Sequence, residues 1–244
     1  MSTSPNIRIF ADKQILAESL AKEFSDLVNR LAREKEQVNI ALSGGSTPSL
    51  FFRAMVALEP EIDWGNIRFY WVDERCVPPD HPESNFGVAY REFLAPLNVP
   101  EDAYFRIRGE NHPAEEAKRY DALIHEQVGT GAAIPAFDII FLGMGADGHT
   151  ASIFPDQSQL WNEPQLCTVG VHPETGQRRV TFTGRLINAA TRVSFLVTGQ
   201  EKAAIVQKVV TRTGNYADYP ASLVAPYQGQ LEWFLDKAAG STVG

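Results

Sequence analysis

The sequence predicts an α/β protein whose mainly parallel sheet is flanked by helices. Short β-rich runs alternate with longer segments of helical periodicity, which is the pattern of successive βαβ units. Three unusual segments, residues 43–48, 73–78 and 143–155, each follow a predicted strand. Because ligands bind beyond the carboxyl ends of the strands in such sheets, we expect these segments to converge on one rim.

The first elements are recognised from their apolar spacing. Residues 7–10 form a short β-rich run that predicts a strand. Residues 13–34 carry apolar side chains every three or four positions, which predicts a long amphipathic helix, and Asp12 suits its N-cap. Residues 38–42 are a short apolar run followed by a serine and two glycines, so a second strand is predicted there.

The central elements follow from the same patterns. Pro48 stands where the first turn of a helix tolerates proline, and residues 49–58 continue as the predicted helix. The aromatic run at residues 67–72 predicts a third strand, and residues 114–128 have helical spacing. The apolar run at residues 137–142 predicts the strand that leads into the glycine-rich segment.

The last third of the chain continues the alternation. Residues 166–171, 180–182 and 193–197 are predicted as strands from their β-branched and aromatic content. Residues 201–210 and 230–239 are predicted as helices.

Composition limits the classes of function. The net charge of −8 disfavours nonspecific nucleic-acid binding and anionic membrane surfaces, so we expect a small-molecule partner instead. No apolar run approaches a membrane helix, and no secretory signal is visible. Cys76 and Cys167 are too few for a disulfide framework or a zinc site, which predicts a cytoplasmic protein with reduced thiols. No linker or repeat interrupts the chain, so residues 1–244 are expected to form one domain.

The glycine-rich turn after the second strand is a candidate phosphate site. Its residues join a strand to a helix start, where backbone amides and the helix dipole favour an anion: Ser43, Gly44, Gly45, Ser46 and Thr47. The same residues also suit a simple N-cap on a tight turn, and that alternative stays open. A P-loop is excluded because no lysine follows, and a nucleophile elbow is excluded because Pro48 stands where its second glycine belongs.

The turn after residues 137–142 has the letters of a dinucleotide fingerprint, at Gly143, Gly145 and Gly148. A dinucleotide site needs a long helix after its third glycine, and Pro155 prevents one. The alternative is that the glycines surround a catalytic His149, the natural base at neutral pH, with Asp147 to orient its ring. A purely local role for both residues, as a cap and a loop support, is equally compatible with the pattern.

An ordered set of segments resembles the 6-phosphogluconolactonase family over nearly the whole chain. These segments are ALSGGSTP (41–48), WVDERCVP (71–78), ESNFGVA (83–89), DIIFLGMGADGHTASIFP (138–155), RRVTFT (178–183), LINAA (186–190), VTGQEKA (197–203) and PASLVAP (220–226). The resemblance implies a Rossmann-like α/β fold of the sugar-phosphate isomerase/deaminase type. It also implies hydrolysis of 6-phosphoglucono-δ-lactone in the oxidative pentose phosphate pathway, without a cofactor or metal, by a monomer or small homo-oligomer.

Two other functions remain open. Glucosamine-6-phosphate deaminases share the glycine turn and the Asp-Gly-His element, but their pattern resembles DGHIAFNEP, with an acid before the proline. Phe154 precedes Pro155 here, which favours the lactonase. A nonenzymatic sugar-phosphate-binding regulator would use the same phosphate site. Arg185, which precedes LINAA, departs from the expected pair of residues and is expected to be exposed.

The resemblance suggests a role for each candidate residue. His149 would take a proton from water, and Arg75 with the amides of Gly143 and Gly145 would stabilise the oxyanion. Arg179 and Lys202 would join the glycine turn in holding the phosphate. Each cation has a simpler alternative: Arg75 in an ion pair with Asp73 or Glu74, Arg179 on a solvated strand, and Lys202 exposed in a first helical turn. Asn85 is left outside the catalytic set.

Overall fold

The computed structural model describes residues 6–129, 131 and 133–243, and its centre is a seven-stranded parallel sheet in the order β1-β10-β9-β6-β2-β3-β5. Every neighbouring pair in this sheet runs parallel. The strands are β1 (Asn6–Phe10), β2 (Val38–Leu42), β3 (Ile67–Trp71), β5 (Tyr104–Phe105), β6 (Ile139–Leu142), β9 (Arg192–Val197) and β10 (Gln230–Asp236). The predicted α/β class with a mainly parallel sheet is therefore confirmed.

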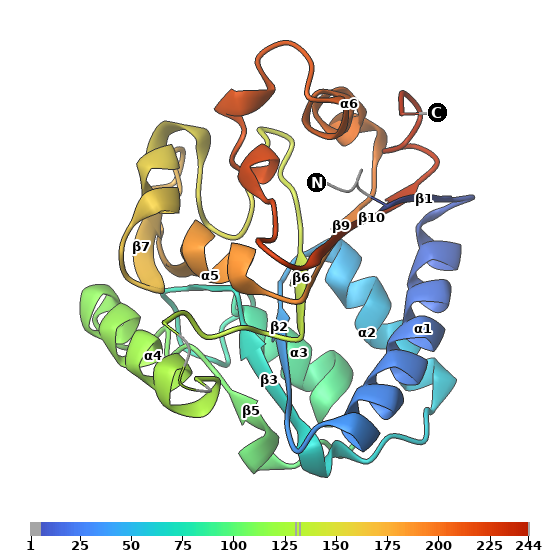
Figure 1. The fold of residues 1–244 in the computed structure, drawn as a ribbon, viewed down its shortest axis with the longest axis vertical. Coiled ribbons are helices and arrows are strands. Elements are labelled where there is room, and N and C mark those ends of the chain that lie inside the picture. Colours follow the sequence, from blue (N-terminus) through green and yellow to red (C-terminus); the bar gives the residue numbers. More distant parts are fainter. Residues whose placement is uncertain (1–5, 130, 132, 244) are drawn as a thin grey trace.

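Helices cover both faces of this sheet. In Figure 1, α1 and α2 lie on one side, and α4 lies on the other beside a small antiparallel sheet of order β4-β8-β7. The α-helices are α1 (Lys13–Glu34), α2 (Ser46–Leu58), α3 (Asn85–Ala89), α4 (Pro113–Gln127), α5 (Gly184–Ala189) and α6 (Ala203–Thr211). The small sheet consists of β4 (Asp73–Arg75), β7 (Cys167–Val171) and β8 (Arg178–Phe182).

Short turns of tighter or wider helix complete the described chain. A π-helical turn spans Tyr90–Leu94. The 3₁₀ segments are Trp64–Asn66, Glu101–Ala103, Pro155–Asn162, Gln200–Lys202, Tyr216–Asp218 and Pro220–Leu223.

Most predicted elements are found within a few residues of their expected bounds. Asp12 caps α1 as predicted, because its carboxylate accepts hydrogen bonds from the amides of Gln14 and Ile15. β2 and β6 are buried along their whole length, as expected for central strands of a parallel sheet.

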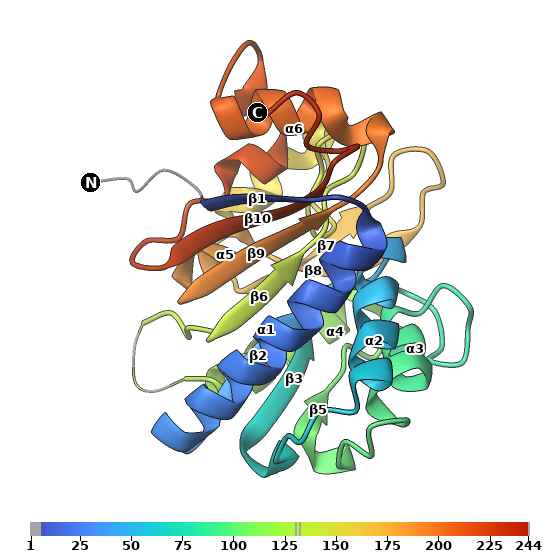
Figure 2. The same ribbon diagram turned by 90° about the vertical axis from the view of Figure 1, so that its right-hand side faces the viewer.

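The prediction of a helix at residues 230–239 is wrong. This segment contains β10, which lies between β1 and β9 (Figure 2). Its last five residues are buried, including Trp233 and Phe234, whose side chains point to opposite faces of the sheet. A strand buried on both faces lacks alternation, so its short apolar run cannot be distinguished from a helix by periodicity.

The order of the strands determines where a ligand can bind. From β2 the chain continues outward to β3 and β5, whereas β6, β9 and β10 extend the sheet in the other direction. The connection therefore reverses between β2 and β6, and a crevice is expected beyond the carboxyl ends of the strands at this point. The glycine turn follows β2 and the histidine turn follows β6, so the two turns flank this crevice.

No helix among the described residues is both long and apolar enough to span a bilayer.

Candidate active site

One cavity of about 250 Å³ gathers the segments that follow β2, β3, β6 and β9. These four strands are consecutive neighbours in the sheet, so their carboxyl ends meet at one rim, as predicted. All but one of the candidate residues line this cavity: Ser43, Gly44, Gly45, Ser46, Thr47, Arg75, Gly143, Gly145, His149, Arg179 and Lys202. The exception is Asp147, whose carboxylate contacts His149.

His149 and Asp147 form a pair within the histidine turn. The Nδ1 atom of His149 lies 2.6 Å from Oδ1 of Asp147, and the same oxygen accepts the backbone amide of His149 at 3.2 Å. Partial burial alone would raise the pKa of Asp147, but the hydrogen bond and charge of His149 together hold it below its ordinary value. The carboxylate is therefore the acceptor and Nδ1 carries the proton, so a ring with a single proton presents Nε2 as its basic nitrogen.

The backbone of the histidine turn is internally bonded. The amide of Gly145 donates to the carbonyl of His149 at 3.0 Å, so this amide is not free to stabilise an oxyanion as the sequence suggested. Thr150 donates its hydroxyl to the carbonyl of Gly143 at 2.9 Å and fixes the start of the turn. The amide of Gly143 has no acceptor among the residues that the structure describes, and it remains available to a ligand.

Two of the three hydroxyl groups in the glycine turn are buried and hydrogen-bonded within the protein, and the third is exposed. Ser43 donates to the carbonyl of Phe141 at 2.8 Å, and Thr47 shares a 2.8 Å hydrogen bond with Thr198, so both buried hydroxyls tie the turn to β6 and β9. Ser46, by contrast, is exposed in the first turn of α2 and faces the cavity. The amides of this first turn have no partners within the helix, which leaves them for an anion.

The three cations of the cavity form no ion pair with any carboxylate in the described part of the chain: Arg75, Arg179 and Lys202. Arg75 and Arg179 are direct partners in the antiparallel pairing of β4 with β8. Arg75 donates Nη1 to the carbonyl of Glu83 at 2.6 Å, while its buried Nε has no partner among the described residues. The alternative of a structural ion pair for Arg75 is thus not found.

Burial affects two of these cations. It lowers the pKa of Arg179, and the positive charge of Arg75 acts in the same direction while Asp73 opposes it. Burial likewise lowers the pKa of Lys202, against the charges of Glu201 and Asp236. A bound dianion would relieve the repulsion between Arg75 and Arg179 and replace the hydration that Arg179 and Lys202 have lost.

Two polar residues of the cavity were not assigned to the site from the sequence. Asp73 is buried and accepts the hydroxyl of Ser152 at 2.6 Å, which joins β4 to the histidine turn. Asn85 donates to the carbonyl of Asp73 at 2.9 Å, and a Cβ on Gly44 would lie 1.8 Å from its Oδ1. Gly44 therefore permits Asn85 to approach the glycine turn, a requirement that the spacing of local motifs does not indicate.

The amide of Asn85 and the short helix α3 are held in turn by Glu74. This buried carboxylate accepts the amides of Arg75, Asn85 and Phe86 at 2.7–2.8 Å and the hydroxyl of Ser84 at 3.0 Å. Burial raises the pKa of Glu74 to about 7, although the three amides oppose this shift. Glu74 is thus occupied in supporting the rim and does not pair with Arg75.

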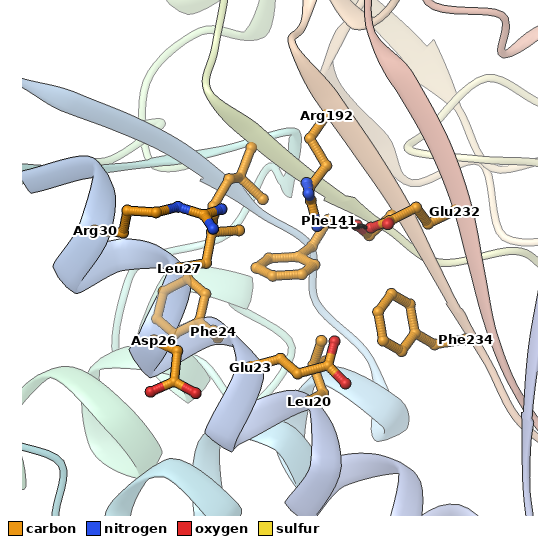
Figure 3. A pocket seen from close by; sticks show the side chains of 12 residues that line it. Leu20, Glu23, Phe24, Asp26, Leu27, Arg30, Phe141, Arg192, Glu232 and Phe234 are labelled. Carbon is orange, nitrogen blue, oxygen red and sulfur yellow. Dashed lines mark hydrogen bonds and ion pairs between the residues drawn. The ribbon is translucent and has the colours of Figure 1, made fainter. Parts of the chain in front are cut away.

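A second cavity, of about 200 Å³, lies between α1 and strands β6, β9 and β10 (Figure 3). None of the candidate residues lines it. Its buried carboxylate, Glu232, forms an ion pair with Arg192 at 3.1 Å, and Ser194 donates to the same carboxylate at 3.3 Å. These three groups satisfy one another, and no histidine lines this cavity.

Arg185 lies outside both cavities, half-buried, and donates to the carbonyl of Pro164.

Comparison with known proteins identifies the family. The family model described as glucosamine-6-phosphate isomerases/6-phosphogluconolactonase matches residues 11–233. This chain belongs to that family. A protein of Treponema pallidum named 6-phosphogluconolactonase is 44% identical over 204 residues, which are 83% of this chain and 83% of the relative. Another of that name, from Haemophilus influenzae, is 40% identical over 94% of this chain and 96% of its own length.

A solved structure extends the family likeness to three dimensions. The 6-phosphogluconolactonase from Trypanosoma cruzi matches with a TM-score of 0.86 and 30% sequence identity, over 100% of this chain and 98% of that one. The resemblance inferred from the ordered motifs is therefore confirmed at the level of both sequence and fold.

Proposed function

We propose that this chain hydrolyses 6-phosphoglucono-δ-lactone to 6-phosphogluconate, a step of the oxidative pentose phosphate pathway, in the cytoplasm. The observation that carries the proposal is one cavity that joins a histidine–aspartate pair to three cations without ion-pair partners among the described residues. The pair supplies a base at neutral pH, and the cations suit a phosphorylated substrate. Relatives named 6-phosphogluconolactonase match most of the chain, which supports the same substrate.

His149 acts as the general base in this proposal. Its Nε2 takes a proton from water while the oxygen of that water bonds to the lactone carbonyl carbon, and the carbonyl electron pair moves onto its oxygen. The carbonyl then re-forms as the bond to the ring oxygen breaks, and Nε2–H returns its proton to that oxygen. Asp147 keeps the required tautomer and stabilises the imidazolium that forms between the two steps.

The developing oxyanion needs donors that are already in place. The amide of Gly143 and the guanidinium of Arg75 are the available groups, and the Nε of that guanidinium has no partner among the described residues. Such preorganised donors act in a partly desolvated site, where each typically contributes about two to three decades in rate.

The substrate phosphate is held at the other side of the cavity. The first turn of α2 presents its backbone amides and the hydroxyl of Ser46, and Arg179 and Lys202 add positive charge. Ser43 and Thr47 shape the turn through their bonds to β6 and β9. Binding energy from the phosphate then positions the lactone carbonyl against His149.

The test is hydrolysis of freshly prepared 6-phosphogluconolactone by the purified protein, followed as acid release and corrected for spontaneous opening. We expect turnover well above the buffer rate, and a loss of about two to four decades in His149→Ala. Glucosamine 6-phosphate serves as the counter-substrate, and no ammonia release is expected from it. A lactone rate equal to that of buffer, or enzyme-dependent ammonia release, would contradict the proposal.

A further inference from the structure

The ring of Phe154 is fully buried directly beside the proposed base. The ring centroids of Phe154 and His149 are 4.7 Å apart, with their planes tilted by 44°. A tight reversal between Thr150 and Ile153, with Ala151 at a φ of +49°, returns the chain toward His149. A non-glycine residue in this left-handed conformation is unusual. At Ala151 this conformation reverses the chain, so that Phe154 lies beside the imidazole.

The same ring contacts a second candidate residue from a different part of the fold. The Cζ atom of Arg179, on β8, lies 5.7 Å from the centroid of Phe154, within the range of a cation–π interaction. His172 packs edge-on against Phe154 from another direction, with centroids 5.2 Å apart. Phe154 therefore contacts both the proposed base, His149, and the cation from β8 that is proposed to bind the phosphate, Arg179.

We propose that Phe154 is a positioning residue that holds the His149 ring and the Arg179 guanidinium in register while leaving the guanidinium without an anionic partner among the described residues. The inference rests on the proposed function, because it assigns these two groups to one reaction. Phe154 touches neither substrate nor reacting atoms in this role, since it does not line the cavity. It acts only through His149 and Arg179.

The chemistry of the ring explains why a neutral aromatic suits this position. A carboxylate here would lie close to both Arg179 and His149 and would compete with the substrate phosphate for the charge of Arg179. The ring instead attracts the guanidinium weakly through its quadrupole and cannot neutralise it. Its rigidity also limits movement of the imidazole, which is held from another side by the hydrogen bond to Asp147.

The test compares Phe154→Leu, Phe154→Met and Phe154→Tyr with the control Phe93→Leu. Phe93 is also fully buried, but it packs against Trp64 and Phe69, away from the cavity. Phe154→Leu should lower kcat by about 10- to 100-fold through misplacement of the base. It should also raise KM by about threefold or more because Arg179 loses its support.

The other variants distinguish positioning from general stability. Phe154→Tyr keeps the ring and should retain kcat within about fivefold of the parent, whereas Phe154→Met should resemble the leucine variant. Phe93→Leu should lower Tm with little change in either kinetic constant. The inference is overturned if folded Phe154→Leu or Phe154→Met keeps both constants within about twofold, or if Phe93→Leu reduces kcat equally.

Failure of the proposed function has a separate signature, because the parent protein itself would then leave the lactone unhydrolysed. In that case inorganic phosphate is the probe, titrated into parent and Phe154→Leu, with the ring nitrogens of His149 followed by NMR. A phosphate Kd weakened by about threefold together with shifted His149 signals supports positioning. An unchanged Kd with unchanged signals in the folded variant overturns it.

Discussion

A Cβ atom on Gly145 would lie 2.2 Å from Nδ1 of His149. It would also lie 2.4 Å from Oδ1 of Asp147, the oxygen that is hydrogen-bonded to that nitrogen. The φ of Gly145 is not positive, so glycine is needed here for space and not for backbone freedom. The histidine–aspartate pair thus packs directly against the backbone of its own turn. This packing is possible only because residue 145 has no side chain.

Replacing Gly145 with alanine is therefore expected to displace the imidazole without unfolding the protein. We expect kcat to fall by about two decades, since a displacement of about 1 Å has that order of effect. The measurement is kcat and KM for the lactone beside Tm. Gly65→Ala is the control, because its added Cβ would meet only the far end of the Asp63 side chain, at 3.1 Å. Wild-type kcat in folded Gly145→Ala would show that the observed ring position is not required.

Local patterns made both turns predictable. Glycines at a strand end, followed by serine and threonine at a helix start, indicate an anion site because the chemistry lies in adjacent backbone groups. The Asp-x-His spacing likewise places carboxylate and imidazole in one turn, where the structure finds them 2.6 Å apart. The convergence of the turns followed from parallel strands, whose carboxyl ends share an edge.

The remaining features depend on contacts between distant segments. Asn85 lines the cavity because it packs against Gly44, which is distant in sequence. Asp73 is held there by a hydrogen bond from the hydroxyl of Ser152, which is also distant in sequence. The hydroxyls of Ser43 and Thr47 bond to neighbouring strands, and nothing in the glycine turn itself specifies this. The roles proposed for the site residues stay predictions until the variants are measured.

Replacing Asp147 with asparagine tests the orientation of the base. The change keeps the shape of the side chain but removes the charge that stabilises an imidazolium, and it permits the wrong tautomer of His149. We expect kcat to fall by about two to four decades, with a small change in KM. NMR of the ring nitrogens reports the tautomer independently of activity. A variant with normal kcat would reduce Asp147 to a support of the loop.

Lys202 is expected to give anion binding a dependence on alkaline pH. Its pKa is lowered by burial, so on raising the pH its charge is lost earlier than that of an ordinary lysine, near 10.4. The affinity for 6-phosphogluconate, which is stable at these pH values, should therefore weaken as pH rises toward 10. Lys202→Arg should remain charged and flatten this profile, and Lys202→Met should bind weakly throughout. A profile for the parent as flat as that of Lys202→Arg would remove Lys202 from the phosphate site.

Arg75 has no carboxylate partner among the described residues. Its Nη1 donates to the carbonyl of Glu83, and its Nε is buried without a partner in the described chain. Replacement of Arg75 by alanine should therefore lower the free energy of unfolding only slightly. Arg68 is a matched control, because it also donates Nη1 to backbone carbonyls, those of Gly65 and Ile67 at 2.8 Å each, and it lies away from the cavity.

We expect Arg75→Ala to lower kcat/KM by about two to three decades while Tm stays close to that of the parent, because the guanidinium acts on the developing oxyanion. Arg75→Lys keeps the charge but loses the planar fork, so it should retain only part of the activity. Arg68→Ala should alter Tm by a similar small amount and leave kcat/KM unchanged. Single-turnover rates and Tm are measured on the same preparations. If well-folded Arg75→Ala opens the lactone at the parent rate, the oxyanion must be stabilised by other donors, with the amide of Gly143 as the remaining candidate.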